Sequence, residues 1–322
     1  MSASSVSVAM IQRISTTAVE AHALALPGWQ LRYDQTSDGC FAGHLDTLQF
    51  EGLQVIRDRA NRAMRKRGEA WPGALVVSLP LRGSDMRMYC EGHCHQDPCL
   101  LVTPDHGLPE LHTPAQVEVL VLAIERTLVD DLLEEQRDRR GLRTLTLHRR
   151  CPATLQPLLA VSQDLFDTQA LSAAMNTHAV VRRSMRDRLL QVVLDLLDPA
   201  AGAPLHPSAS KRLVDRAREY ALAHAEHAPT ILELCRHVGA SRRKLQYCFQ
   251  NSIGITPVAY LRALRLNQVR RALASEGPGR TVQDIAAAWG FWHPSRFAGE
   301  YRQLFGQSPS QTRRQALALP LR

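Results

Sequence analysis

The stretch TILELCRHVG, residues 230–239, recurs in degenerate form as TVQDIAAAWG, residues 281–290. Each copy opens with a threonine that is followed three residues later by a carboxylate, Glu233 or Asp284, which is the capping-box pattern of a helix start. Each copy closes on a glycine, which permits the positive φ that a tight turn between two helices requires. The repeat therefore predicts two helix-turn-helix units. A helical repeat without a nucleic acid partner would show a similar pattern.

Basic charge is concentrated in the same part of the chain. Residues 204–322 contain 18 Lys and Arg against 7 Asp and Glu, whereas residues 1–203 contain 21 against 24. A positive balance confined to the part that carries the repeat is typical of a domain that binds the phosphates of nucleic acid. We therefore expect the two units to bind double-stranded DNA.

The second helix of each unit is expected to enter the major groove of DNA. Arginine bonds bidentately to guanine and glutamine to adenine, so Arg243 and Gln246 are the predicted base readers, whereas Arg242 and Lys244 are expected to contact phosphate. A connecting helix over residues 257–274 would be about 27 Å long and could place the two reading helices in successive grooves. The predicted DNA-binding residues are Ser241, Arg242, Arg243, Lys244, Gln246, Tyr247, Gln250, Ser295 and Arg296.

Residues 213–314 resemble the AraC/XylS family of transcription regulators. The resemblance rests on the double unit, the connecting helix and the terminal pattern of Gly290, Phe291, Phe297, Tyr301, Phe305, Gly306, Ser308 and Pro309. The DNA-contacting positions of the family's second reading helix match Pro294, Ser295, Arg296, Ala298 and Gly299 here. Only Arg296 among them is a strong base reader, so we expect the second unit to read bases less than the first. The resemblance implies activation and RNA polymerase as a partner.

Within that family the chain looks closest to the branch that contains the ethanolamine operon regulator. The likeness is carried by residues 241–246, 265–270 and 289–293, and more weakly by residues 29–34 and 70–72. It implies an activator that responds to the small-molecule effectors ethanolamine and adenosylcobalamin. Aromatic faces and a carboxylate can cage a protonated amine, although such aromatic residues are also common in protein cores. The candidate effector residues are Trp29, Tyr33, Asp34 and Trp71.

The front half of the chain is predicted to be mainly β. Apolar segments at residues 45–50, 75–81 and 117–124 predict strands, and residues 58–67 or nearby predict one helix. The expected fold class is α+β. Its expected parts are a β-rich, cupin-like effector-binding domain over residues 1–150, a helical dimerisation or linker region over residues 151–200, and an all-helical DNA-binding domain over residues 205–322. The apolar stripe of residues 177–197 could pack on its own domain or form a homodimer.

A cluster of thiols and imidazoles is a second candidate site. Cys90, His93, Cys94, His95 and Cys99 are of the types that bind zinc, but their spacing matches no standard finger, and a turn between strands would look similar. This leaves a metal-binding sensor and a ligand-independent DNA-binding protein as alternatives. An enzyme is disfavoured, because the sequence contains no paired general acid and base, phosphate loop or nucleophile motif. Seven cysteines and the lack of a membrane-length apolar run predict a cytoplasmic protein with reduced thiols.

Overall fold

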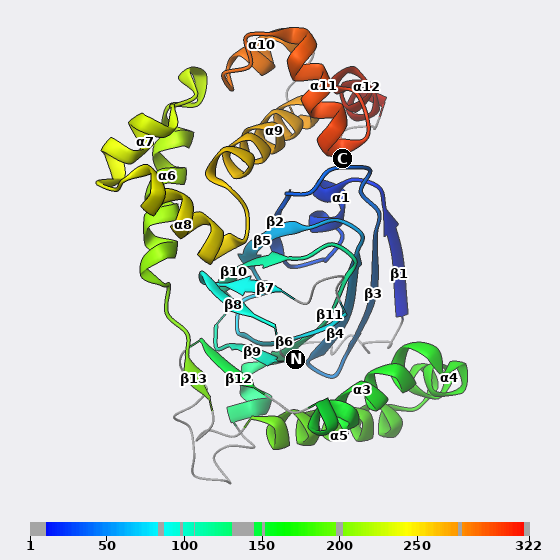
Figure 1. The fold of residues 1–322 in the computed structure, drawn as a ribbon. Coiled ribbons are helices and arrows are strands. Elements are labelled where there is room, and N and C mark those ends of the chain that lie inside the picture. The colour runs from blue at the N-terminus through cyan, green and yellow to red at the C-terminus, as the bar shows by residue number, and fades with distance from the viewer. Residues whose placement is uncertain are drawn as a thin grey trace.

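The chain folds into a β-rich N-terminal domain and a helical C-terminal domain (Figure 1). The computed structural model describes residues 11–82, 87–96, 99–105, 107–130, 145–149, 152–197, 202–275 and 279–318. The predicted fold class is confirmed, since two antiparallel sheets precede two helix-turn-helix units. Within the described residues, no helix is long and apolar enough to cross a bilayer.

The two sheets have eight and five strands. The larger sheet has the order β1-β3-β4-β11-β6-β9-β12-β13, and the smaller sheet has the order β2-β5-β10-β7-β8. In the larger sheet the strands are β1 (Ile11–Thr16), β3 (Gly43–Phe50), β4 (Leu53–Ala60), β6 (Ala74–Arg82), β9 (Cys99–Thr103), β11 (Val117–Glu125), β12 (Thr146–Arg149) and β13 (Ala203–Pro204). In the smaller sheet they are β2 (Gln30–Gln35), β5 (Met64–Glu69), β7 (Met88–Cys90), β8 (His93–His95) and β10 (Gly107–Thr113).

The helix predicted at residues 58–67 is wrong. This stretch contains the end of β4, a turn and the start of β5. Strand β4 pairs with β3 and β11, while β5 pairs with β2 and β10, so both strands satisfy their backbone groups across long sequence separations. Tertiary pairing overrides the helical propensity of this arginine-rich stretch. The strands predicted at residues 45–50, 75–81 and 117–124 are present as β3, β6 and β11.

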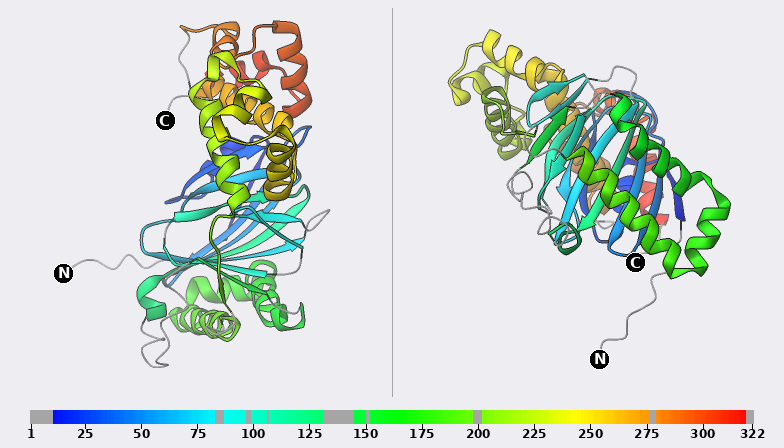
Figure 2. Two further views of the ribbon diagram at one scale, coloured as in Figure 1. Left: turned by 60° about the vertical axis from the view of Figure 1, so that its left-hand side comes forward. Right: turned by 90° about the horizontal axis from the view of Figure 1, so that it is seen from below.

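Three helices cover one face of the larger sheet (Figure 2). They are α3 (Pro152–Asp167), α4 (Gln169–Thr177) and α5 (Ala179–Leu196), whereas the short helix α1 (Val19–Leu24) lies elsewhere. Leu158 of α3 and Leu189 and Val193 of α5 share a buried core with strand residues such as Val55 and Val77. The apolar stripe of α5 thus packs on the chain's own sheet. This agrees with the first of the two alternatives that the sequence left open, packing on its own domain, although Val180 at the start of the helix remains exposed.

One charged residue of α5 lies inside the core. Arg182 is buried and donates to the carbonyl of Met175 at 2.7 Å. The end of the predicted dimerisation or linker region, residues 198–200, lies outside the described residues. The described chain resumes at residue 202 and enters β13, which pairs with β12 at the edge of the larger sheet.

The C-terminal domain contains two small cores that share one helix. The helices are α6 (Ala209–Ala223), α7 (Ile231–Val238), α8 (Arg242–Ile253), α9 (Pro257–Ser275), α10 (Val282–Ala287), α11 (Pro294–Phe305) and α12 (Pro309–Ala318), with a short 3-10 turn η2 (Ala225–His227). Leu261 and Leu264 of α9 pack in the first core, and Leu266 and Val269 pack in the second. With 19 residues, α9 is about 28 Å long and spaces the two units.

Both units begin with the predicted capping boxes, and both turns contain a left-handed glycine. Gly239 has φ of 66° and an added Cβ would meet no other atom within 4 Å, whereas Gly290 has φ of 75° and an added Cβ would lie 3.0 Å from the carbonyl oxygen of Ala225. We expect Gly239→Ala to cost about 1–2 kcal/mol of stability from backbone strain alone. Gly290→Ala should cost more, because crowding adds to the same strain. Equal midpoint shifts in urea unfolding of the two variants would contradict this.

Candidate DNA-reading surface and ligand cavity

Helix α8 presents an uninterrupted polar face to solvent. The hydroxyl of Ser241 caps the helix by accepting from the backbone nitrogen of Lys244 at 3.2 Å. Leu245, Cys248 and Phe249 are buried, so the helix is anchored on one side. The predicted first-unit residues are all exposed on its other side or at its start: Ser241, Arg242, Arg243, Lys244, Gln246, Tyr247 and Gln250. The structure therefore gathers them on one accessible helix.

Two of these side chains have local partners. The ammonium of Lys244 lies 5.5 Å from the ring centroid of Tyr247, and Gln250 donates from Nε2 to the carbonyl of Gly254 at 3.1 Å. Arg243 and Gln246 have no side-chain hydrogen bond or ion pair within the described residues. Their free donors and acceptors are available to base edges, as the sequence-based prediction requires.

Helix α11 of the second unit offers a weaker surface. Ser295 and Arg296 are exposed, but Nε of Arg296 bonds Oε1 of Glu300 one turn later at 2.9 Å. The carboxylate partly neutralises the one strong base reader of this helix. The structure therefore adds a physical reason for unequal readout by the two units.

A cavity of about 60 Å³ lies between the two sheets. Its lining is mostly apolar and includes Trp29 and Tyr33, two of the predicted effector residues. Trp29 donates from its indole nitrogen to Oε1 of Gln54 at 2.6 Å. The polar lining consists of Tyr33, Asp58, Lys66, Arg67, Ser78, Thr103 and Thr113.

Asp58 and Lys66 form a charged pair in the cavity wall, and neither residue is among the predicted site residues. Nζ of Lys66 lies 2.5 Å from Oδ2 of Asp58, and Nε2 of His22 lies 3.0 Å from Oδ1. Burial alone would raise the pKa of Asp58, but Lys66 and His22 outweigh it and lower the pKa well below its ordinary value. Lys66 also lies 4.9 Å from the ring centroid of Tyr33. The only signal that could have identified them is the alternation of inward-facing residues along β4 and β5, two strands of different sheets in the stretch that the sequence predicts as a helix.

The other two predicted effector residues do not line the cavity. Asp34 follows Tyr33 in β2, and successive strand residues point to opposite faces, so Asp34 faces away from the cavity. Trp71 is half-buried beside a neighbouring apolar cluster. The aromatic cage with a carboxylate is therefore not assembled as predicted.

The cysteine and histidine cluster is also dispersed. Cys90 and Cys99 are buried among Met88, Leu101 and Leu147, whereas His93 and Cys94 are exposed and His95 is buried. Burial, and then the charge of Glu91, raise the pKa of the Cys90 thiol well above its ordinary value, which opposes the thiolate that a metal binds. Within the described part of the chain, no three His, Cys, Asp or Glu residues are grouped to hold a metal ion. The arrangement does not support the predicted metal site.

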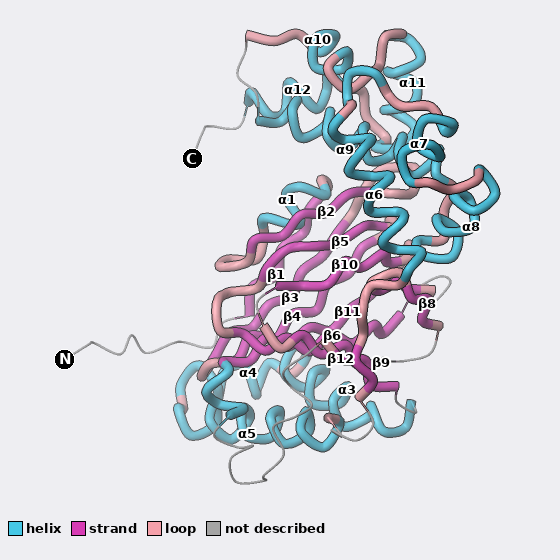
Figure 3. Tube along the Cα trace, turned by 90° about the vertical axis from the view of Figure 1, so that its left-hand side faces the viewer, coloured by secondary structure: helices cyan, strands magenta, loops and turns pink. Residues whose placement is uncertain are grey.

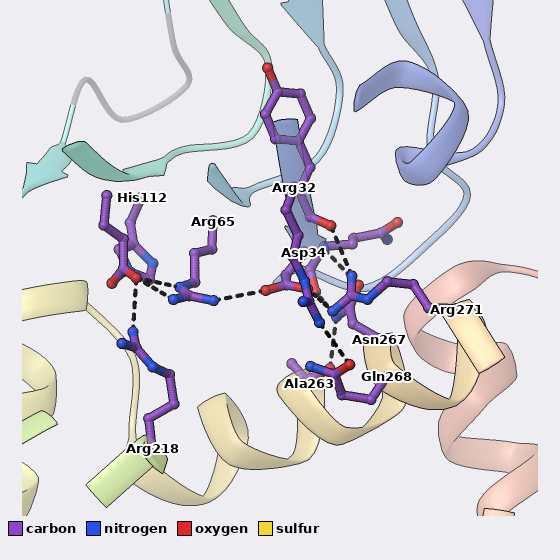
Figure 4. Close-up of polar contacts among 12 residues, drawn as sticks. Arg32, Asp34, Arg65, His112, Arg218, Ala263, Asn267, Gln268 and Arg271 are labelled. Atoms are coloured by element: carbon purple, nitrogen blue, oxygen red, sulfur yellow. Dashed lines mark hydrogen bonds and ion pairs between the residues drawn. The ribbon is translucent and has the colours of Figure 1, made fainter. Parts of the chain in front are cut away.

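Asp34 instead joins the two domains (Figure 4). Its carboxylate accepts from Nη2 of Arg271 on α9 at 2.6 Å and from Nη1 of Arg65 on β5 at 3.0 Å. Asp34 is only 2% exposed. Burial opposes its charge, yet the two arginines outweigh burial and lower its pKa. A buried ion pair thus connects the β domain to the helix that spaces the reading units.

Glu110 forms a second interdomain junction beside the first. It accepts from Nε of Arg65 at 2.7 Å and from Nη1 of Arg218 on α6 at 2.8 Å, and Nε2 of His112 lies 3.2 Å away. Despite burial, hydrogen bonding to His112 and the charge of Arg65 lower the pKa of Glu110 far below its ordinary value. Arg65, 1% exposed, therefore bridges both interdomain carboxylates.

The edge of the smaller sheet is covered by an amide from α9. Asn267 donates to the carbonyl of Gln35 at 2.8 Å and accepts from its backbone nitrogen at 2.9 Å. Strand β2 is an edge strand, so these bonds occupy backbone groups that would otherwise lack a strand partner. Arg32 adds a bond to Gln268 at 2.8 Å.

The smaller sheet therefore has two distinct faces, and it meets the C-terminal helices as Figure 3 shows. Tyr33 and Lys66 face the cavity, while their neighbours Asp34 and Arg65 face the helical domain. The cavity and the docked helices thus lie on opposite sides of the smaller sheet, separated only by the thickness of that sheet.

His112 is expected to make stability depend on pH. Burial lowers its pKa despite the opposing effect of Glu110, so the native state resists the protonation that the unfolded chain accepts near pH 6.5. This stabilisation is complete above about pH 6.5 and is lost as the pH falls below it. His112→Gln retains a donor for Glu110 but cannot be protonated. Urea unfolding between pH 7 and 5 should show a shallower loss of stability for this variant, and parallel curves would contradict the prediction.

Comparison with known proteins supports the assignment of the C-terminal domain as a helix-turn-helix domain. Residues 234–315 match the family described as "Helix-turn-helix domain". A probable thc operon regulatory protein from Rhodococcus erythropolis is 38% identical over 43% of this chain and 42% of its own length. The HTH-type transcriptional regulator CdhR from Pseudomonas aeruginosa is 28% identical over 56% of this chain and 58% of its own length. The chain thus covers less than two thirds of each of these relatives.

A probable AraC family transcriptional regulator from Rhodopseudomonas palustris is 32% identical, with 33% of this chain and 97% of that chain covered at a TM-score of 0.30.

Proposed function

We propose that this chain, whose C-terminal domain is an AraC-type helix-turn-helix domain, is a transcription regulator that binds double-stranded DNA under the control of a small molecule. The observation that carries the proposal is the exposed polar face of α8, set in a helix-turn-helix domain with a family match. We also propose that Ser241, Arg242, Arg243, Lys244, Gln246, Tyr247 and Gln250, with Ser295 and Arg296, form the DNA-binding surface. The relatives are named as regulators, which favours a non-enzymatic role.

The interdomain network provides the means of control. A ligand changes DNA binding only if it has different affinities for two arrangements of the domains. The cavity and the docking contacts share β2 and β5, so a ligand that moves Tyr33 or Lys66 also bears on Asp34 and Arg65. Activation through RNA polymerase is part of the same proposal, because one protein similar to this chain is named as a transcriptional activator.

Ethanolamine and adenosylcobalamin are candidate effectors by resemblance alone. The cavity wall contains two cationic side chains, Lys66 and Arg67, and its carboxylate, Asp58, already binds Lys66. This charge balance does not favour a protonated amine. The cavity of about 60 Å³ is also many times smaller than a corrinoid.

Selection from a random library of duplexes with the full chain tests the proposed DNA binding. We expect recovery of a defined sequence, and footprinting of that sequence should show two protected segments about one helical turn apart. Recovery of only unrelated sequences would contradict sequence-specific binding. One protected segment would contradict the use of both units.

A further inference from the structure

An exposed tryptophan lies just before the second reading helix, α11. Its neighbours Trp289 and Phe291 pack against the second small core, and the rings of Phe291 and Phe297 lie 5.2 Å apart. Trp292 is not part of that core and is 62% exposed. Contact of so large an apolar side chain with water is unfavourable, and packing within the unit does not account for it.

Trp292 borders a groove of about 630 Å³ on the surface of the second unit. The first turns of α10 and α12 form part of its wall, and Pro294 and Ala298 add apolar surface from α11. Among the described residues that line the groove there is no carboxylate, and the one charged side chain is that of Arg302. The groove therefore suits an occupant that carries negative charge and presents a small apolar group.

The place of the groove in the helix-turn-helix unit indicates this occupant. In such units the first helix crosses the DNA backbone, and the start of the second helix contacts base edges in the major groove. The groove lies between α10 and α11, the two helices of the second unit, and Trp292 and Pro294 are at the start of α11. Thymine is the base that presents a methyl group in the major groove.

We propose that Trp292, together with Pro294 and Ala298, recognises the 5-methyl group of a thymine in the second half-site. Arg302, at the same groove, binds a phosphate of that strand. The contact gives α11 a means of reading a base that does not depend on Arg296, which already binds Glu300. This inference rests on the proposed function and deepens it, because it names a base that the second unit selects.

The expected contribution of the contact is modest. Burial of one methyl group against an apolar surface changes an affinity about fourfold. A bidentate bond from arginine to guanine discriminates more strongly, so the second half-site is read more weakly than the half-site that Arg243 reads.

Replacement of thymine by uracil tests the contact, because the two bases differ only by the methyl group. The duplex selected by the full chain is synthesised with one thymine at a time replaced, and affinities are measured by fluorescence anisotropy at one salt concentration. The first unit's half-site is the one in which mismatches lose their effect in Arg243→Ala. In the other half-site, at least one replacement should weaken binding about fourfold.

Variants of Trp292 then locate the methyl contact. Trp292→Ala should bring the affinity ratio of thymine to uracil at that position close to one, and should leave any uracil effect in the first half-site unchanged. Trp292→Phe retains an apolar ring and should retain most of the ratio. Trp292→Gln lacks the ring and should lose most of it, so the test stands even if the alanine variant does not fold. Val180→Ala is the control, since it shortens an apolar side chain that is 76% exposed on α5, and it should keep the full ratio.

Failure of this inference is distinguishable from failure of the proposed function. If the unmodified chain selects no duplex, the proposed function fails and the thymine contact fails with it. If the chain binds a defined duplex, three results would refute the thymine contact alone. They are a second half-site without thymine, uracil replacements there that leave affinity unchanged, and a full thymine-to-uracil ratio in both Trp292→Ala and Trp292→Gln.

Discussion

Replacing Asp34 by asparagine is expected to lower the free energy of unfolding of the full chain by about 3–5 kcal/mol. The change removes the charge from a carboxylate that is 2% exposed and binds two arginines, Arg65 and Arg271. Both guanidinium groups remain in place with an uncharged amide between them. The large cost arises because buried cations lose their compensating charge, and not because one contact is missing.

Urea unfolding of the purified full chain measures this effect. Asp187→Asn is the matched control, since Asp187 is 62% exposed and pairs with Arg186 at the surface. Exposed pairs contribute about 0–1 kcal/mol, so the control should unfold nearly as the unmodified chain does. Similar midpoints for the two variants would show that the interdomain pair contributes little.

The second large effect concerns base readout. Arg243→Ala should reduce the preference for the selected sequence over a duplex mismatched in the first half-site by about 1–3 kcal/mol, which is roughly 5-fold to 150-fold. Arg243 is exposed on α8 and has no competing partner within the described residues. Arg296→Ala should instead weaken binding to matched and mismatched duplexes by the same factor. The loss should be smaller than that caused by Arg243→Ala on the matched duplex, because Glu300 already binds Arg296.

Fluorescence anisotropy at one fixed salt concentration separates these outcomes. The ratio of affinities for matched and mismatched duplexes reports base readout, while the affinity for the mismatched duplex reports phosphate contact. Arg188→Ala serves as the control for loss of one exposed positive charge. Comparable losses on every duplex for Arg243→Ala and Arg296→Ala would contradict unequal readout.

Features that depend on nearby residues were predictable from the sequence. The capping boxes at Thr230 and Thr281 and the two left-handed glycines involve groups only a few residues apart, so their patterns are visible in the chain. The same holds for α9, which the sequence predicts as the connecting helix over residues 257–274. Local chemistry was therefore sufficient to predict the surface that we propose reads DNA.

Features that depend on strand pairing were not predictable. The error at residues 58–67 also concealed Asp58, Lys66 and Arg65, because their faces are defined only once β4 and β5 are recognised as strands. Asp34 was selected for its charge but faces α9 and not the cavity. Asn267 meets Gln35 across more than 200 residues of sequence, and no local pattern signals such a contact.

The salt dependence of DNA binding by the full chain tests the central claim most directly. Affinity for the selected duplex should fall linearly with salt on a double-logarithmic plot, with a slope of about −0.9 for each phosphate contacted, and should exceed the affinity for a scrambled duplex by about 10³-fold or more. Affinity that is insensitive to salt, or absent for every duplex, would contradict the account of the C-terminal domain as a DNA-reading module.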